Sequence, residues 1–253
     1  MLPAVLVTGG ARRIGATIAR AFGAAGWHVV IHCGRSHGEA EALAASLPSA
    51  EVVQCELSDT DAAAAMIAAL AGRLADWRVL VNSAAVFRED TAQALDPAIF
   101  AETMAINAAA PVRMAQAFLA HARSKGGRRV INLTDMKLAN PNPDFFSYTM
   151  SKHAFAATIR MLAMAQADAQ PESGDRIYGL APGAMLPSFD QQPEEHQISG
   201  RMNLLGRITA PQELAEAALF LSQGWLASGE TLYVDSGQHL LSQPRDVLFL
   251  ARE

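Results

Sequence analysis

The stretch that decides the fold is AVLVTGGARRIGATIARAFGAA, residues 4–25. Its apolar start, Ala4–Val7, predicts a short buried strand, and the alanine-rich segment that runs to about Ala25 predicts a helix. Between them lies a turn with three glycines, Thr8–Gly15. A strand, a glycine turn and a helix in this order let backbone N–H groups and a helix N-terminus receive a pyrophosphate. Many turns between strands and helices contain glycines, and the spacing here is T-G-x-x-x-R-x-G, so the turn alone does not identify a nucleotide site.

The rest of the chain continues this alternation of apolar strands and helical segments. Six further strands are predicted, at residues 27–32, 51–54, 79–81, 129–133, 176–180 and 231–234. The clearest helices are predicted at residues 62–74, 97–124, from about 147 onward, and 211–221. Such alternation is typical of an α/β fold with a doubly wound parallel sheet and helices on both faces, which binds ligands at the C-terminal ends of its strands. The segment 184–203 has no clear periodicity, and its length indicates a substrate loop.

Composition restricts the class of protein. A chain of 253 residues, 51% hydrophobic and 18% charged, is long enough for one large domain, which we expect to span residues 1–253. The net charge of −5 argues against nucleic acid or an anionic membrane as the main partner. Two cysteines, Cys33 and Cys55, are too few for a disulfide framework, and no apolar stretch reaches the ~20 residues of a membrane span. We therefore expect a cytoplasmic protein without a signal peptide.

A second informative stretch is TDMKLANPNPDFFSYTMSK, residues 134–152. Asp135 follows a predicted strand, two prolines force a loop, and helical sequence then begins. Tyr148 and Lys152 lie four residues apart, so they share one face of that helix. A nearby ammonium favours the phenolate and lowers the tyrosine pKa, which would suit proton transfer near neutral pH. A surface pair without a task is the alternative.

Other candidate ligand contacts also follow predicted strands. Arg35 and Ser36 follow the second predicted strand, where a site that prefers NAD usually has an acidic residue for the ribose diol. Arg35 suits a 2′-phosphate instead. The alternative is that Arg35 is a solvated loop residue. Small residues at 82–85 would let a ligand approach, and Phe87 at the same rim is either a ligand platform or part of the core. Asn107 is polar within an apolar helical stretch, so we expect it to make specific hydrogen bonds.

Taken together, these residues resemble the short-chain dehydrogenase/reductase family along nearly the whole chain. The matching segments are Thr8-Gly9…Gly15, Asn82-Ser83-Ala84, Asn107, Tyr148-x-x-x-Lys152, Pro182-Gly183 and Val234-Asp-Ser-Gly237. The resemblance implies a Rossmann-type sheet of about seven strands and a homotetramer. It also implies that Tyr148 donates a proton, that Lys152 lowers its pKa and holds the nicotinamide ribose, and that Asn107 supports a proton-relay water.

Two departures from the family pattern resemble its pteridine reductase branch, which includes dihydromonapterin reductases. Arg13 replaces the middle glycine of the nucleotide loop, and Asp135 replaces the usual active-site serine. In that branch the arginine lies beside the pyrophosphate and the pterin, a phenylalanine at the position of Phe87 stacks on the pterin, and the aspartate delivers protons together with Tyr148. Phe145 falls where the branch carries an aromatic residue.

The resemblance therefore predicts a full set of site residues. The predicted catalytic residues are Asp135, Tyr148, Lys152 and Asn107, and no metal is expected. NADPH would be held by Gly9, Arg12, Arg13, Ile14, Gly15, Arg35, Ser36, Glu56, Leu57, Asn82, Ser83, Ala84, Tyr148, Lys152, Pro182 and Gly183. The pterin-like substrate would be held by Arg13, Phe87, Asp135, Phe145 and Tyr148. Three residues depart from the pattern of the branch: Ala85, Ser83 and Glu56. The departure at Ala85 leaves the exact substrate open.

The chemistry of Asp135 supports the same branch independently. Carbonyl reduction builds negative charge on oxygen, which a serine hydroxyl stabilises and a carboxylate repels. Reduction of a C=N bond needs a proton on nitrogen, which an aspartate with a raised pKa would help to supply. We therefore expect an NADPH-dependent reductase of a dihydropterin or folate-like substrate. The alternatives are a carbonyl reductase, such as one acting on 3-oxoacyl thioesters, in which Asp135 is a drifted loop residue, and a non-catalytic NADPH-binding sensor.

The C-terminal tail, residues 238–253, carries the apolar segment Val247–Leu250. Such a segment is too apolar for a free terminus in water, so we expect it to be buried. In the resembling family, C-terminal segments often pack against a neighbouring subunit near its substrate site. The tail is therefore expected to close the pterin pocket or to seal the tetramer.

Overall fold

The computed structural model describes residues 2–188 and 190–253 and contains one sheet of seven parallel strands. The strand order is β3-β2-β1-β4-β5-β6-β7, which confirms the predicted Rossmann-type sheet. The strands are β1 Ala4–Val7, β2 His28–Cys33, β3 Ala50–Gln54, β4 Trp77–Asn82, β5 Arg129–Leu133, β6 Arg176–Pro182 and β7 Thr231–Val234. Every predicted strand is present, and each boundary lies within two residues of its predicted position.

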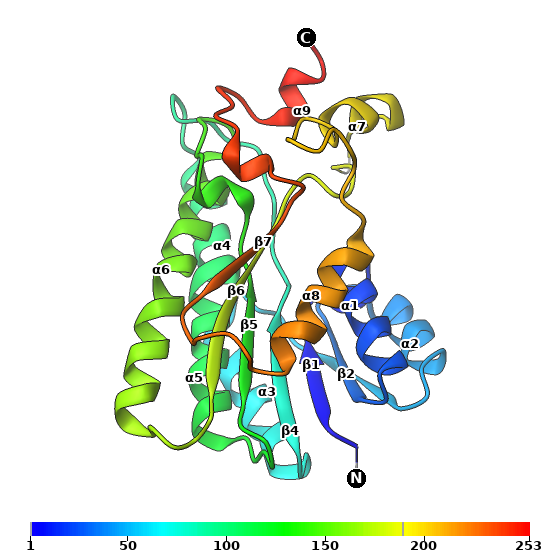
Figure 1. Ribbon diagram of the computed structural model, residues 1–253, viewed down its shortest axis with the longest axis vertical. Helices are drawn as coiled ribbons and strands as arrows, with labels where there is room; N and C mark the ends of the chain where they lie inside the picture. Colours follow the sequence, from blue (N-terminus) through cyan, green and yellow to red (C-terminus); the bar gives the residue numbers. More distant parts are fainter. Residues whose placement is uncertain (1, 189) are drawn as a thin grey trace.

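Helices cover both faces of this sheet (Figure 1). The α-helices are α1 Arg13–Ala24, α2 His37–Ala45, α3 Thr60–Arg73, α4 Pro97–Met104, α5 Ala110–His121, α6 Phe146–Ala169, α7 Pro193–Ser199, α8 Pro211–Ser222 and α9 Val247–Leu250. The predicted helix at 97–124 is observed as α4, a π-helical turn at Ala105–Ala109 and α5 in direct succession, ending at His121. Helix α7 forms within the segment predicted to lack periodicity, because Pro193 starts it and the Glu195 carboxylate accepts the Gln192 N–H at 3.0 Å.

Two apolar cores lie on opposite faces of the sheet. Successive strand residues point to opposite faces, so β1 places Ala4 and Leu6 in one core and Val5 and Val7 in the other. The first core lies against α3 and α5, and the second lies against α1 and α8. Burial on both faces explains why the parallel strands appear in the sequence as continuous apolar runs.

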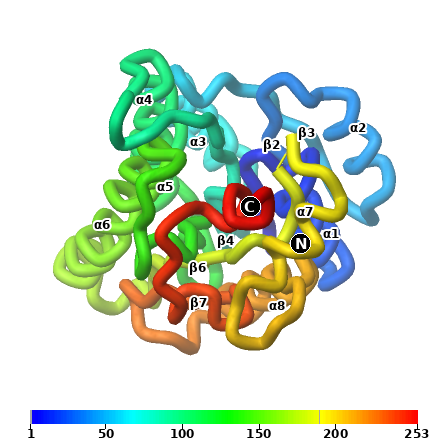
Figure 2. Tube along the Cα trace, turned by 90° about the horizontal axis from the view of Figure 1, so that it is seen from above, coloured from blue at the N-terminus to red at the C-terminus, as the bar shows by residue number. Residues whose placement is uncertain are grey.

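The C-terminal ends of the strands carry the loops and the tail. Figures 1 and 2 show α9 above these ends and next to α7, while the N-terminus lies at the opposite end of the sheet. Among residues 2–188 and 190–253, no helix combines the length and the hydropathy of a membrane span. The same residues contain no group of three or more His, Cys, Asp or Glu side chains arranged to hold a metal ion.

Candidate active site

The glycine turn between β1 and α1 borders a cavity of about 460 Å³. Gly9 has a φ of 60°, and a Cβ on Gly15 would overlap the Gly9 carbonyl oxygen, so both positions require glycine. Helix α1 begins at Arg13, and no side chain of the described residues caps its N-terminus; its first turn also carries no acid. Its first N–H groups therefore suit an anion, such as a pyrophosphate, at this edge of the cavity.

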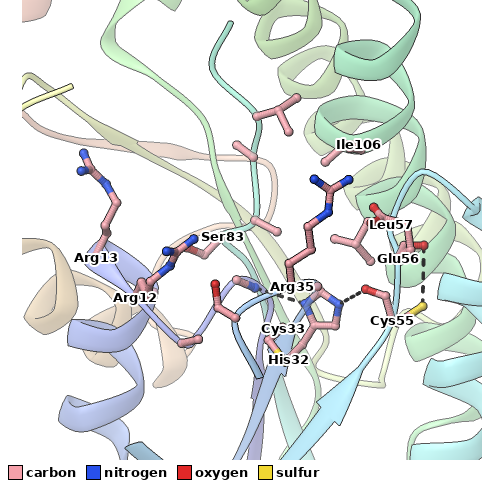
Figure 3. Close-up of a pocket in the computed structure, with 18 of the residues that line it drawn as sticks. Arg12, Arg13, His32, Cys33, Arg35, Cys55, Glu56, Leu57, Ser83 and Ile106 are labelled. Carbon is pink, nitrogen blue, oxygen red and sulfur yellow. Dashed lines mark hydrogen bonds between the residues drawn. The ribbon is translucent and has the colours of Figure 1, made fainter. Parts of the chain in front are cut away.

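His32 connects the glycine turn to the end of β3 through two hydrogen bonds. Its side chain is 2% exposed, its Nδ1 accepts the Gly9 N–H at 3.2 Å, and its Nε2–H donates to the Cys55 carbonyl at 3.0 Å (Figure 3). Burial lowers the pKa of His32, which favours the neutral ring that these two bonds require. Sequence reasoning missed this residue, although a histidine inside the apolar run of β2 was an available signal.

Most residues predicted to bind the cofactor line the cavity. They are Gly9, Arg12, Arg13, Ile14, Gly15, Arg35, Ser36, Glu56, Leu57, Ser83 and Ala84. Arg35 extends into the cavity from the end of β2, whereas Arg12 and Arg13 lie at the α1 side (Figure 3). The Arg13 guanidinium donates to the Pro187 carbonyl at 2.8 Å, and Arg12 lies 3.6 Å from Glu39. Unpredicted residues at the cavity include His32, Cys33, Cys55, Arg88, Glu102 and Ile106.

The other predicted cofactor residues lie outside the lining of this cavity. Asn82 is buried, and its Nδ2 donates to Asn132 Oδ1 at 2.9 Å, so its amide links β4 to β5. Pro182 ends β6, and a Cβ on Gly183 would lie 2.6 Å from Gln238 Oε1, so the chain packs closely there. The last two, Tyr148 and Lys152, belong to a neighbouring cluster at the start of α6.

Within that cluster, Tyr148 and Asp135 form a direct hydrogen bond. Tyr148 Oη donates to Asp135 Oδ2 at 2.7 Å, and Asp135 Oδ1 accepts the Lys137 N–H at 2.9 Å. Burial raises the pKa of Asp135, although the hydrogen bond and the charge of Lys137 oppose this shift. Burial and then the Asp135 charge raise the pKa of Tyr148 well above its usual value. The two side chains therefore share one proton across a partly buried hydrogen bond.

Lys152 lies beside this pair but makes its hydrogen bond elsewhere. Its Nζ donates to the Leu133 carbonyl at 2.8 Å and lies 5.6 Å from the centroid of the Tyr148 ring. Burial lowers the pKa of Lys152 to about 8. The pKa of Tyr148 is raised overall, first by burial and then by Asp135, so the lowering expected from Lys152 is not seen as a net shift and stays a prediction.

Asn107 lies in the π-helical turn between α4 and α5. Its Oδ1 accepts the Val86 N–H at 2.8 Å, and its Nδ2 donates to the Val86 carbonyl at 2.9 Å and to Ser151 Oγ at 3.2 Å. The predicted specific hydrogen bonds are thus present. They connect the strand end that carries Phe87 to the helix that carries Tyr148, and π-helical turns are frequent at functional sites.

Three aromatic rings meet next to the hydrogen bond between Tyr148 and Asp135. Phe87 stacks on Phe145 with 4.0 Å between ring centroids, and it meets the Tyr148 ring edge-on at 4.6 Å. Phe145 has a φ of 51° and immediately precedes α6. The structure therefore brings together four of the five predicted substrate residues, namely Phe87, Phe145, Tyr148 and Asp135.

Comparison with known proteins places this geometry in context. Residues 9–239 match the family described as enoyl-(acyl carrier protein) reductase. The chain is 33% identical to FolM alternative dihydrofolate reductase 1 from Brucella canis, crystallised with NADP, with a TM-score of 0.88 and 96% of each chain covered. It is 29% identical to the granaticin polyketide synthase putative ketoacyl reductase 2 of Streptomyces violaceoruber, covering 94% of this chain and 97% of that protein. It is 28% identical to pteridine reductase 1 of Leishmania tarentolae, covering 94% and 96%.

Proposed function

The chain belongs to the short-chain dehydrogenase/reductase family, and we propose that it is an NADPH-dependent reductase of a C=N bond in a dihydropterin or folate-like ring. The observation that carries this proposal is the direct, partly buried hydrogen bond between Tyr148 and Asp135. A carboxylate next to the proton donor disfavours an oxyanion but suits delivery of a proton to nitrogen. Similarity to FolM and to pteridine reductase 1 supports the same substrate class.

The cavity at the glycine turn fits the cofactor. The α1 N-terminus would receive the pyrophosphate, Arg35 and Ser36 would contact the 2′-phosphate, and Lys152 would hold the nicotinamide ribose. When bound, the cofactor supplies the hydride. No acidic residue lies at the end of β2, where recognition of a free ribose diol would require one.

Proton delivery follows from the raised pKa of Asp135. In the observed arrangement the phenolic proton of Tyr148 is directed at the carboxylate, and it is not available to a substrate. When Asp135 is protonated, the hydrogen bond can reverse, so that the acid donates to Tyr148 Oη and the phenol donates to the ring nitrogen. Burial raises the pKa of Asp135, so the protonated acid that this relay needs is present at higher pH than for an ordinary aspartate. Asp135 then recovers its proton from solvent.

The aromatic cluster supports a flat substrate. The partly exposed ring of Phe87 lies beside Tyr148 and is backed by the buried ring of Phe145, and aromatic rings favour stacking on such a surface. A small aliphatic ketone would make less use of it. We also propose a homotetramer, which is supported by two large apolar side chains exposed on α6, Met161 and Met164.

A substrate panel tests the proposed function. NADPH oxidation would be followed with dihydrobiopterin, dihydromonapterin and dihydrofolate, and in parallel with simple ketones and a 3-oxoacyl thioester. We expect at least one dihydropterin or dihydrofolate to be reduced with a kcat/KM about tenfold or more above that of any carbonyl substrate. The similarity to a ketoacyl reductase makes carbonyl reduction the competing function, and preferential turnover of ketones would establish it instead.

The Arg35→Ala variant tests the cofactor assignment. Arg35 extends into the cavity with an exposed side chain, and a charge-assisted hydrogen bond to phosphate contributes roughly 1.5–3 kcal/mol. Its loss should raise the Kd for NADPH by about tenfold to a hundredfold and change the Kd for NADH little. Fluorescence titration with both cofactors measures this, with Arg35→Lys as the variant that keeps the charge. An equal loss for both cofactors, or a wild type that prefers NADH, would contradict the assignment.

A further inference from the structure

The C-terminal segment covers the catalytic pair of its own chain. Tyr148 is 8% exposed and Phe145 is 4% exposed, and both pack with Leu248 in one apolar cluster that also contacts Phe249. The rings of Phe145 and Phe249 are nearly parallel, with centroids 5.8 Å apart. The first two residues of α9, Val247 and Leu248, are therefore buried, as the apolar sequence predicted, and the last two are half-buried. Leu248 packs against Tyr148 on the side where we place the substrate.

A buried ion pair holds this segment in place. Lys137 Nζ lies 2.6 Å from Asp246 Oδ2, and the side chains are only 6% and 11% exposed. The same ammonium donates to Asn142 Oδ1 and to the Asp144 carbonyl, each at 3.2 Å. Removing one member of such a pair leaves an uncompensated buried charge, so the segment and Lys137 stabilise each other.

Three further contacts hold the same segment. Asp144 accepts the Arg245 Nε–H and the Asp246 N–H, each at 2.8 Å. At the end of the chain, Arg252 lies 3.0 Å from Glu195 on α7. The segment 245–252 is thus held at three places. Arg245 contacts Asp144 before α9, Asp246 contacts Lys137 and Asp144 at the start of α9, and Arg252 contacts Glu195 after its end.

Lys137 also connects the segment to the catalytic carboxylate. Its backbone N–H donates to Asp135 Oδ1, while its side chain pairs with Asp246. Lys137 lies in the short 3-10 turn Met136–Leu138. If its side chain moves with the tail, its backbone N–H moves too, and this N–H is a hydrogen-bond donor to Asp135. One residue therefore links the position of the tail to the orientation of the proton relay.

We propose that the segment Arg245–Leu250 is the outer wall of the substrate site, and that Lys137 is a positioning residue that holds this wall through Asp246. The proposal rests on the proposed function for the shape of the substrate, a flat ring that enters the stack formed by Phe87, Phe145 and Phe249. Because Tyr148 and Phe145 are buried beneath the segment, the wall moves outward when a ring enters and returns over it. Leu248 and Phe249 then set the room available above the ring.

Trypsin cleavage after Arg245 tests whether the pair holds the segment. Cleavage requires the local backbone to leave its place, and mass spectrometry detects release of the last eight residues, 246–253. Lys137→Met leaves the cleavage site unchanged and should accelerate this release about tenfold or more. In an Asp246→Asn background, Lys137→Met should increase the rate of release by no more than about twofold, because the carboxylate that pairs with Lys137 is already absent. The control is Arg207→Met, which breaks an exposed pair with Glu213 of the same 2.6 Å length and should leave the rate unchanged.

A second variant tests the wall without disturbing a buried charge. Phe249 is half-buried, so Phe249→Ala should fold, and it should raise the substrate KM about threefold or more while the Kd for NADPH stays within about twofold. The KM is measured with whichever substrate of the panel is reduced, so a wild type that reduces only ketones sinks the proposed function and still permits this test. An unchanged KM, or a Lys137→Met effect on cleavage that is absent or equal in both backgrounds, overturns the inference.

Discussion

The Tyr148→Phe variant is expected to lose nearly all turnover while it still binds NADPH. Tyr148 Oη donates to Asp135 at 2.7 Å, so phenylalanine removes the proposed proton donor and keeps the aromatic packing. General acid catalysis contributes roughly 10²–10⁴-fold to the rate, and kcat should fall by that order. Steady-state kinetics and a fluorescence titration with NADPH separate the loss of chemistry from a loss of binding.

Two variants serve as comparisons for this experiment. Tyr178→Phe removes the hydroxyl of another buried tyrosine, which donates to the Leu226 carbonyl at 2.7 Å and does not line the cavity, and it should leave kcat unchanged. Phe87→Ala deletes a stacking surface and should mainly raise the substrate KM. If Tyr148→Phe kept more than about a tenth of the wild-type kcat, Tyr148 would not be the proton donor.

Much of the fold could be predicted because burial on both faces of a parallel sheet leaves a simple pattern. Strands such as β1 and β5 appear in the sequence as uninterrupted apolar runs, and helix starts such as Asp59 before α3 carry caps that the sequence displays. The close approach at Gly15 likewise permits only one residue type. These features depend on neighbours along the chain, so one sequence was sufficient to find them.

The contacts that complete the site depend on residues distant in sequence, and those were not predicted. Nothing near His32 indicates that it bonds to both Gly9 and Cys55, because the three residues meet only when β1, β2 and β3 pair. Likewise, Lys137 and Asp246 look like ordinary loop charges in the sequence. Their pairing requires the path of the tail, which the local pattern does not determine.

The pKa of Tyr148 shows a different limit. A spacing of four residues correctly predicted that Lys152 lies on the same helix face. It did not predict where the ammonium points, nor that burial and a carboxylate at hydrogen-bond distance shift the tyrosine pKa in the opposite direction. A sequence spacing determines which residues are neighbours, whereas the sign of a pKa shift depends on every group within a few ångströms.

Asp135 is the most informative residue to change, because it bonds directly to Tyr148 and raises the pKa of that tyrosine. Asp135→Ser restores the hydroxyl that carbonyl reductases of the resembling family carry, and the shorter side chain can still donate to a developing oxyanion. Serine cannot act as the acid of the relay, so reduction of the dihydropterin or folate-like substrate should fall by about tenfold or more, and weak ketone reduction should appear. Asp135→Asn is the matched control, because it keeps the size and an acceptor for the Lys137 N–H but removes the acid.

The pH dependence separates this relay from a merely structural role. The pKa of Asp135 is raised, so the protonated acid is present at low pH and is lost as the pH rises through that pKa. The wild-type kcat/KM for the C=N substrate should fall across the same range, and both Asp135→Ser and Asp135→Asn should lose this limb of the profile. If the wild type instead reduces ketones well and ignores pterins, and Asp135→Ser makes little difference to rate or pH profile, then Asp135 is a drifted loop residue and the protein is a carbonyl reductase.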